Sequence, residues 1–381
     1  MQNLRISGLP ASGYYGICEG IEYESHSWAN LVKGCKNVYT MNSKICSDIW
    51  EKKNCKRCMM VDNIVLFLMQ VKGISRKTIY KNFQLESGEY SLGNIQDIIK
   101  QAALNTKKIN VPGMQELEGV YDKYQSIIER SNELGIRIFS YLDQGFPTKL
   151  RKIADPPAVV YVLGNTECLN EKAVAVIGTR EPIEHGAKIA EQLGFVLGRE
   201  GYTVVSGLAY GCDKFGHMGC LRAKGKTAAV MAGGLDKVYP AQHKELAQEI
   251  VGAGGCLISE YPVNTPTFKN GLVERDRLQS GLSEGLIIVE TDVKGGTWHT
   301  IEYAKEYGRR IGCYKHPSQY ALEKQTKGNQ LLLQEKETFG IGNDDDLFEY
   351  RKLIDQKHDE LMQEDTLVEM TQLSFLDVMG G

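Results

Sequence analysis

Residues 172–314 alternate short apolar runs with amphipathic segments, and this alternation limits the possible folds more than any other feature of the chain. The apolar runs end near six positions: Ile177, Ser206, Met231, Ser259, Glu290 and Tyr314. Between the first two runs, apolar residues recur at the i, i+4, i+7, i+8 spacing of one helix face: Ile189, Leu193, Val196 and Leu197. Strands that alternate with helices predict a doubly wound, mostly parallel α/β sheet with helices on both faces.

Small and polar residues follow the apolar runs. The candidate ligand contacts among them are Gly178, Thr179, Arg180, Ser206, Gly207, Gly211, Gly295, Gly296 and Thr297. In a doubly wound sheet, ligands bind beyond the carboxyl ends of the strands, and glycine lets backbone amides approach an anion. Glycine also occurs in ordinary loops, but its repetition after successive strands favours an anion pocket. The chain lacks GxGxxG and GxxxxGKS/T, so we expect neither a dinucleotide cofactor nor Walker-type nucleotide hydrolysis.

Charged residues near these strand ends are further candidates. Arg180 and Lys244 suit phosphate contacts, although a structural salt bridge is an alternative for Arg180. Asp213 and His217 lie four residues apart on one helix face, where either proton transfer or a structural hydrogen bond explains the spacing.

Arg275 and Arg277 flank an aspartate. Their guanidinium groups share one face of an extended segment but diverge on a helix, and either phosphate contact or a solvated surface fits the pattern. Glu260 and Glu290 end two of the apolar runs and are expected to shape the pocket.

The charge of the chain is unevenly distributed. The net charge is −3, but from Ile341 onward eleven acidic residues face three basic ones, so that segment carries −8 and the remainder +5. A mildly positive body with an acidic tail is compatible with a nucleic-acid ligand. The sequence has no run of about 18 to 20 apolar residues and no basic N-terminal segment followed by an apolar one, so we expect a cytoplasmic protein without a membrane span.

The ten cysteines fall into two groups. Five are scattered through the predicted strands and helices and are expected to be small buried side chains: Cys168, Cys212, Cys220, Cys256 and Cys313. The other five lie in the first 58 residues, where only Cys55 and Cys58 have CxxC spacing. Because a zinc site needs a second close pair of ligands, we expect no metal site.

The sequence predicts four regions. They are an unassigned N-terminal extension (1–59), a small helical domain (60–141), the α/β domain (142–335) and an acidic C-terminal helix and tail (336–381). The pattern changes abruptly at Met60, so either the folded protein starts there or the preceding segment is a separate small domain. In the second region, two short helices joined at Gly73 resemble a helix-hairpin-helix (SAM-like) unit, whose turn either holds a phosphate or only packs.

Several blocks of sequence occur in a family-specific order. They are Ile177–Arg180, Val204–His217, Gly234–Asp236 with Tyr239-Pro240, Leu257–Glu260, Arg275–Arg277 and Val289-Glu290. Together they resemble the DNA-processing protein A family (DprA, also called Smf), and the resemblance covers about residues 62–333. It implies a Rossmann-like homodimer that binds single-stranded DNA in a basic pocket without turnover. It also implies that the protein protects this DNA and loads a RecA-type recombinase for recombination and transformation.

The resemblance also assigns roles to residues. Arg180 and Lys244 would hold the DNA backbone, while the glycine turns would line the pocket. Two places differ from the family pattern: Asp276 replaces an asparagine, and Gly295-Gly296-Thr297 replaces Ser-Gly-Ser/Thr. Trp298, which follows the second of them, either stacks on a base or packs against the protein.

An enzymatic function is the alternative. Gly295-Gly296 with Thr300 and Glu302 loosely resembles the PGGxGTxxE loop of the Lonely Guy phosphoribohydrolases, which cleave nucleoside monophosphates on a related fold. The threonine lies one place late, and Lys294 replaces the proline.

The C-terminal segment carries two predictions. Asp344-Asp345-Asp346 is expected to cap a helix with Leu347, Tyr350, Ile354 and Leu361 in one stripe. Farther on, a short apolar motif resembles the peptide by which bacterial repair proteins bind the sliding clamp: Gln372, Leu373, Phe375 and Leu376. Docking of this motif on the protein itself is the alternative.

Overall fold

A computed structural model describes the backbone of residues 15–18, 21–24, 59–106 and 108–379, and the side chains of residues 59–106 and 108–363. The chain divides into two compact units, Met1–Met59 and Met60–Gly381. In the first unit, β1 (Tyr15–Cys18) pairs antiparallel with β2 (Ile21–Glu24). Cys55 and Cys58 lie outside the described residues.

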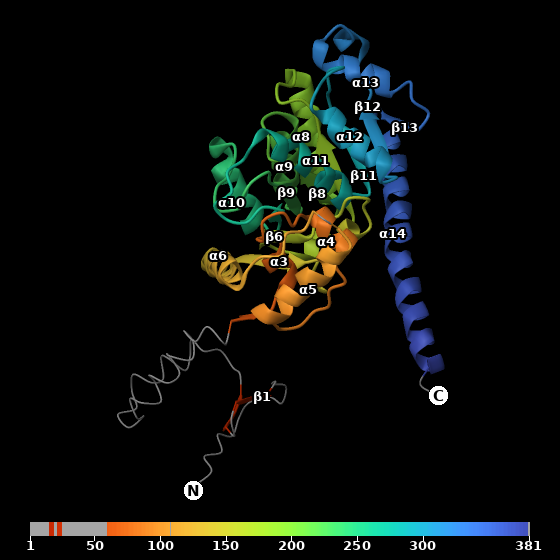
Figure 1. The fold of residues 1–381 in the computed structure, drawn as a ribbon. Helices are drawn as coiled ribbons and strands as arrows, with labels where there is room; N and C mark the ends of the chain where they lie inside the picture. The colour runs from red at the N-terminus through yellow and green to blue at the C-terminus, as the bar shows by residue number, and fades with distance from the viewer. Residues whose placement is uncertain (1–14, 19–20, 25–58, 107, 380–381) are drawn as a thin grey trace, which may run out of the picture. The chain divides into compact units, whose positions relative to one another are not determined.

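The second unit is built on a nine-stranded sheet in the order β13-β12-β11-β7-β8-β9-β10-β6-β5 (Figure 1). The strands are β5 (Ile136–Ser140), β6 (Val159–Gly164), β7 (Ala173–Ile177), β8 (Thr203–Ser206), β9 (Thr227–Val230), β10 (Cys256–Ser259), β11 (Gly285–Ile288), β12 (Arg310–Tyr314) and β13 (Thr338–Ile341). All neighbouring pairs from β13 to β10 are parallel, whereas β6 is antiparallel to both β10 and β5. This sheet confirms the predicted α/β class.

The strand order reverses at β7. From this strand the chain builds outward through β8, β9 and β10, then returns to place β11 on the opposite side of β7. The loops after β7 and β11 therefore leave in different directions, and such a switch point opens a crevice at the carboxyl ends of the strands.

Helices cover both faces of the sheet. Those whose apolar residues join one core are α8 (Glu184–Arg199), α9 (Cys212–Arg222) and α14 (Asp344–Met379). Those of the opposite core are α7 (Thr148–Arg151), α11 (Lys269–Leu282), α12 (Thr297–Glu306) and α13 (Lys327–Leu332). Successive residues of β7 alternate between the two cores, as the pleat of a strand buried on both faces requires.

The predicted face of α8 is confirmed. Leu193 and Leu197 are buried, while Ile189 and Val196 are partly buried against the same core. A further helix, α10 (Lys244–Gly252), packs beside β9 and β10.

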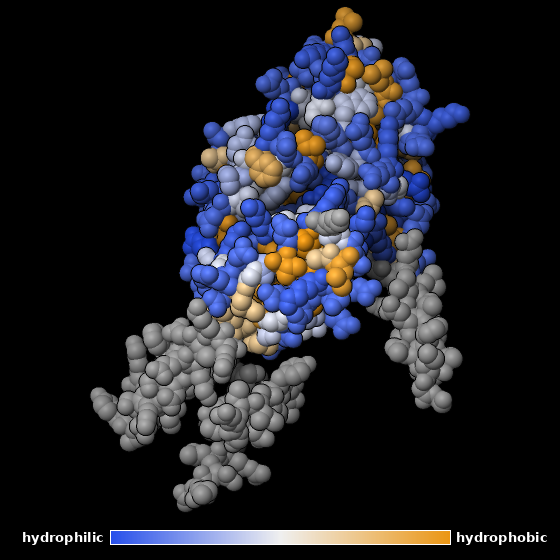
Figure 2. Space-filling view, in the orientation of Figure 1, coloured by the Kyte–Doolittle hydropathy of each residue, from blue (hydrophilic) through white to orange (hydrophobic). Residues whose placement is uncertain are grey.

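The region before the sheet is mostly helical. It contains α3 (Ile64–Leu68), α4 (Arg76–Asn82), α5 (Leu92–Leu104) and α6 (Met114–Glu133), with a short pair formed by β3 (Met60–Val61) and β4 (Tyr90–Ser91). Gly73 has a φ of +86° in the turn between α3 and α4, a backbone conformation that favours glycine. Apolar surface gathers over α4 and α5 (Figure 2).

Three strands differ from the prediction. Residues 136–140, predicted to be helical, form β5, because five residues are too few for the alternation of a strand to stand out. The strand β13 was not predicted, and β11 ends at Ile288 rather than at Glu290.

The C-terminal helix is anchored as its apolar stripe predicts, since Leu347, Tyr350, Ile354 and Leu361 are buried. Its cap is Asn343 rather than the predicted aspartates, because Asn343 Oδ1 accepts a hydrogen bond from the Asp346 amide at 2.8 Å.

A buried charged cluster joins α7, the start of β11 and α14. The fully buried Lys149 Nζ lies 3.2 Å from the equally buried Glu284 Oε1. Glu284 also accepts hydrogen bonds from the Ala173 amide at 2.7 Å and from His358 Nδ1 of α14 at 2.9 Å. Lys149 and His358, more than 200 positions apart in sequence, therefore contact the same buried carboxylate.

The five predicted structural cysteines are buried and free: Cys168, Cys212, Cys220, Cys256 and Cys313. Among the described residues, no three His, Cys, Asp or Glu side chains are arranged to hold a metal ion. In the same part of the chain, no helix combines the length and apolar character needed to cross a membrane.

Candidate functional site

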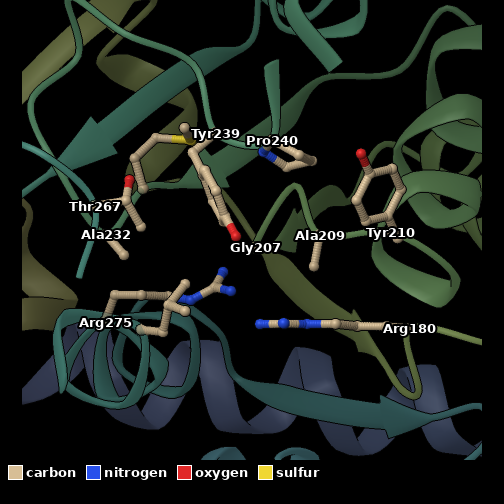
Figure 3. Close-up of a pocket in the computed structure, with 11 residues that line it drawn as sticks. Arg180, Gly207, Ala209, Tyr210, Ala232, Tyr239, Pro240, Thr267 and Arg275 are labelled. Carbon is tan, nitrogen blue, oxygen red and sulfur yellow. The ribbon is translucent and has the colours of Figure 1, made fainter. Parts of the chain in front are cut away.

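A cavity of about 90 Å³ lies over the carboxyl ends of β7, β8 and β9 (Figure 3). Its lining comes from the loops that follow these three strands, from the segment before α10, from the segment before α11 and from α11 itself. The lining residues are Arg180, Gly207, Ala209, Tyr210, Met231, Ala232, Tyr239, Pro240, Thr267, Leu272 and Arg275. We call this cavity the arginine pocket.

Two arginines extend into the pocket from opposite sides, with their guanidinium ends toward each other (Figure 3). Arg180 is exposed, and within the described part of the chain it has no carboxylate partner. Arg275 is 5% exposed, and its Nη1 donates a hydrogen bond to the Val230 carbonyl at 3.1 Å. The pocket therefore combines one solvated cation with one whose position is fixed by the fold.

Gly207 makes room for the fixed arginine. A Cβ atom at this position would overlap Nη1 of Arg275. Gly207 was predicted to contact a bound anion directly. In the structure it instead lies against Arg275, the cation that would bind the anion.

The loop after β8 is fastened by Asp213. This buried carboxylate accepts hydrogen bonds from the amides of Gly207 at 3.1 Å and Ala209 at 3.4 Å. Burial raises the pKa of Asp213, although the nearby Arg275 opposes the shift. Asp213 therefore shapes the pocket from behind and does not line it.

Gly211 joins the loops that follow β7 and β8. Its φ is +77°, and a Cβ there would overlap the Thr179 carbonyl oxygen. The next amide, of Cys212, donates to that same oxygen at 3.1 Å. Gly178 and Ser206 are also structural: a Cβ on Gly178 would crowd Cys212, and the Ser206 hydroxyl donates to the Val176 carbonyl at 2.7 Å.

His217 is a core residue. It is fully buried, and its Nδ1 lies 2.6 Å from the Thr227 hydroxyl, which itself donates to the Val204 carbonyl. Burial lowers the pKa of His217 to about 3, so the ring is neutral. The hydrogen bond to Asp213 that the spacing suggested is not among the contacts of His217.

Arg277 points away from the pocket. Arg277 lies two residues after Arg275 on α11, and two residues of an α-helix correspond to a rotation of about 200° about the helix axis. Arg277 is 1% exposed and forms an ion pair with Glu260, while its Nε lies 3.8 Å from Asp155 Oδ2. Arg275 and Arg277 therefore diverge on a helix, as one of the two predicted arrangements has it. Both are buried, so neither lies on a solvated surface. We assign Arg277 and Glu260 a structural role.

Asp276, between these arginines, does not line the pocket but contacts Arg275, which does. Its Oδ1 lies 3.1 Å from Arg275 Nε and accepts a hydrogen bond from Gln279 at 2.8 Å. Burial raises the pKa of Asp276 to about 6, against the opposing effect of Arg275. Near neutral pH this carboxylate lowers the positive charge of the site.

Other predicted contacts lie outside the lining. Lys244 is exposed at the start of α10, while Gly295 and Gly296 lead into α12, whose first residue is Thr297. Trp298 packs, since its Nε1 donates to the Asp292 carbonyl at 2.8 Å and its ring is partly buried against the core. Glu302, named for the enzymatic alternative, is exposed on α12.

Glu290 shapes the end of β11 rather than the pocket. It is fully buried, and its Oε2 accepts a hydrogen bond from the Ile183 amide at the start of α8, at 3.0 Å. Burial raises the pKa of Glu290 to about 7. A Cβ on Gly186 would overlap this carboxyl group, so the glycine makes space for the Glu290 side chain.

Of the eleven lining residues, the sequence analysis named only Arg180, Gly207 and Arg275 as candidate contacts. Tyr239 and Pro240 were noted as a motif without a role, and the sequence contains no signal for Thr267 and Leu272. Thr267 belongs to the connection from β10 into α11 and Leu272 to the first turn of α11, and the position of both depends on tertiary packing.

The sequence profile of the DNA recombination-mediator protein A family matches residues 137–351. This chain belongs to that family. It is similar to DNA processing protein DprA of Bacillus subtilis (34% identity over 57% of this chain and 70% of that protein) and of Streptococcus pneumoniae (32% identity over 66% and 86%). It also matches protein Smf of a Synechocystis strain at 36% identity, over 44% of this chain but only 43% of that protein.

The fold agrees with this membership. The X-ray structure of DNA processing protein A from Streptococcus pneumoniae superposes with a TM-score of 0.60 and 28% identity, covering 76% of this chain and 97% of that one. The Rossmann-like class implied by the sequence blocks is thus confirmed.

Proposed function

We propose that this chain binds single-stranded DNA through phosphate contacts in the arginine pocket, protects it and delivers it to a RecA-type recombinase. The observation that carries the proposal is the convergence of Arg180 and Arg275 on one cavity at the switch point of the sheet. Guanidinium groups suit phosphate oxygens because their donors are planar and permanently charged. The names of the family and of its relatives, a recombination mediator and DNA processing proteins, support DNA as the ligand.

The position of Arg275 favours a single strand over a duplex. This guanidinium is 5% exposed at the base of a small cavity, so a phosphate must enter the pocket to reach it. A flexible single strand can turn a phosphate inward, whereas a duplex has a persistence length of about 150 base pairs and resists such local bending.

The lining supports binding without turnover. Its polar side chains are two arginines, two tyrosines and a threonine, and none of the lining residues is a carboxylate, a histidine or a cysteine. A general base within reach of a bound nucleotide is what hydrolysis would require.

Further partners follow from the same proposal. Lys244 would extend the phosphate path beyond the cavity, and the chain would act as a homodimer. The motif at Gln372, Leu373, Phe375 and Leu376 would bind the sliding clamp; its side chains lie outside those the structure describes. Deletion of the residues after Thr371 should then weaken binding to the clamp, and unchanged affinity would contradict this part of the proposal.

A binding titration tests the central claim. Fluorescence anisotropy with labelled single- and double-stranded oligonucleotides of one sequence, at two salt concentrations, should show tighter binding to the single strand. Affinity should fall steeply with salt, because binding releases condensed counterions. Equal affinity for both forms would contradict the proposal, as would release of free base from nucleoside monophosphates that Glu302→Gln abolishes.

A further inference from the structure

We infer that Tyr210 and Tyr239 stack on DNA bases at the mouth of the arginine pocket, so that the site holds bases as well as phosphates. The inference rests on the proposed function and adds a second class of contact to it. Five aromatic side chains are strongly exposed in the described part of the chain: Tyr80, Tyr210, Tyr239, Phe268 and Phe348. Two of these five line this one small cavity.

Both rings are exposed to water at the mouth of the pocket. Tyr210 is 43% exposed and Tyr239 is 50% exposed, although burying an aromatic side chain is strongly favourable. Rings kept in water beside converging cations are typical of proteins that stack nucleobases.

Tyr210 is oriented before any ligand binds. Its hydroxyl donates to Gln242 Oε1 at 2.7 Å, and its ring meets the His243 ring edge to face at 4.8 Å. His243 is itself buried and held by a hydrogen bond between its Nδ1 and the Leu208 carbonyl at 2.7 Å. A ring fixed in this way loses little conformational freedom when a base stacks on it.

Tyr239 links the two classes of contact. Its hydroxyl points toward the space between Arg180 and Arg275 (Figure 3), where a phosphate would lie. The ring forms a wall of the same cavity. A nucleotide whose phosphate lies between the guanidinium groups would therefore place its own base, or that of a neighbour, against an aromatic face.

Stacking predicts little discrimination among bases. Every base has a π-face, so contacts to tyrosine rings add affinity without selecting a sequence. The site should bind homopolymers of different bases with similar affinity, but it should bind a strand without bases less well.

The test compares an oligothymidylate with an abasic oligomer of equal length, which keeps the phosphates and lacks the bases. Tyr210→Ala and Tyr239→Ala should each weaken binding of oligothymidylate about tenfold, as loss of one stacked base predicts. Each should change binding of the abasic oligomer less than twofold. Tyr210→Phe and Tyr239→Phe keep the rings and should retain most of the affinity for oligothymidylate.

Phe348→Ala is the matched control, because Phe348 is equally exposed, at 50%, on α14 and does not line the pocket. It should leave both affinities unchanged. Equal losses on the two oligomers for the alanine variants would overturn the inference, since the rings would then act only through pocket structure. If an alanine variant melts well below the wild-type protein, the leucine variant replaces it. Failure of Arg180→Ala to weaken binding of either oligomer would instead contradict the proposed function.

Discussion

The two sides of β7 carry glycine-rich strand ends that are alike in sequence and opposite in chemistry. On the β8 side, Gly207 makes room for the guanidinium of Arg275. On the β11 side, the carboxyl group of Glu290 occupies the space left by Gly186 of α8, and a Cβ on Gly296 would meet nothing within 4 Å. Glycine after a strand therefore marks a close approach or an open turn. The group that approaches decides whether an anion can bind.

The largest effect is expected from filling the space beside Arg275. Gly207→Ala should displace the guanidinium, weaken binding of single-stranded DNA more than tenfold and lower the free energy of unfolding by about 1–3 kcal/mol, the usual cost of overpacking. Gly296→Ala is the control, since the helical φ of −62° at Gly296 suits alanine and the space is open. Anisotropy and thermal melts of both variants check this, and equal behaviour would remove the distinction between the two sides.

Removal of the exposed cation should have the next largest effect. Arg180→Ala should weaken binding about tenfold, because it removes a charge-assisted phosphate contact. It should also reduce the slope of log affinity against log salt by about 0.7. Lys294→Ala removes an exposed cation from the β11 side and should change neither quantity. An unchanged slope in Arg180→Ala would place the phosphate path elsewhere, and Lys244→Ala would then be the next variant to measure.

The pH dependence of the free energy of unfolding tests the role of Glu290 on the β11 side. Burial raises the pKa of Glu290 from 4.5 to about 7, so the folded chain binds a proton that the unfolded chain has already released. The free energy of unfolding should therefore fall as pH rises from 4.5 to 7, with about 2–3 kcal/mol of that change due to this residue. Urea denaturation of Glu290→Gln at several pH values should show a flatter profile. A profile parallel to that of the wild type would mean that folding leaves the pKa of Glu290 unchanged.

The smallest effect concerns Asp276. Burial raises the pKa of Asp276 to about 6, so above that pH its charge opposes a phosphate beside Arg275. Asp276→Asn should bind single-stranded DNA about threefold more tightly than the wild type at pH 7.5, which is the modest size expected of one partly screened charge. At pH 5.5 the two proteins should differ less. Glu302→Gln neutralises an exposed carboxylate on α12 and should alter affinity at neither pH.

The sequence predicted correctly those features that depend on a regular pattern of apolar residues within one continuous segment. The alternation of strands and helices and the buried face of α8 follow from patterns spread over many residues. Arg180 was identified because it directly follows a strand at the edge where ligands bind.

The remaining features depend on packing between distant segments. The segment Arg275-Asp276-Arg277 fits a strand or a helix equally well, and only the packing of α11 directs one guanidinium to the pocket and buries the other against Glu260. The loop at Gly295 has the composition of a ligand loop, but the chain places it beside α12, outside the lining. Tyr239 and Thr267 meet in one cavity although 28 positions separate them in sequence.

The cluster of Lys149, Glu284 and His358 has a consequence for how the molecule opens. Detaching α14 would remove the His358 hydrogen bond from the fully buried carboxylate of Glu284, and loss of a hydrogen bond to a charged group typically costs about 1.5–3 kcal/mol. The helix half that carries the buried stripe should therefore open only together with the sheet. Its amide hydrogens should exchange with solvent deuterium at the slow rate of global unfolding, and not at the rate of a fraying terminal helix.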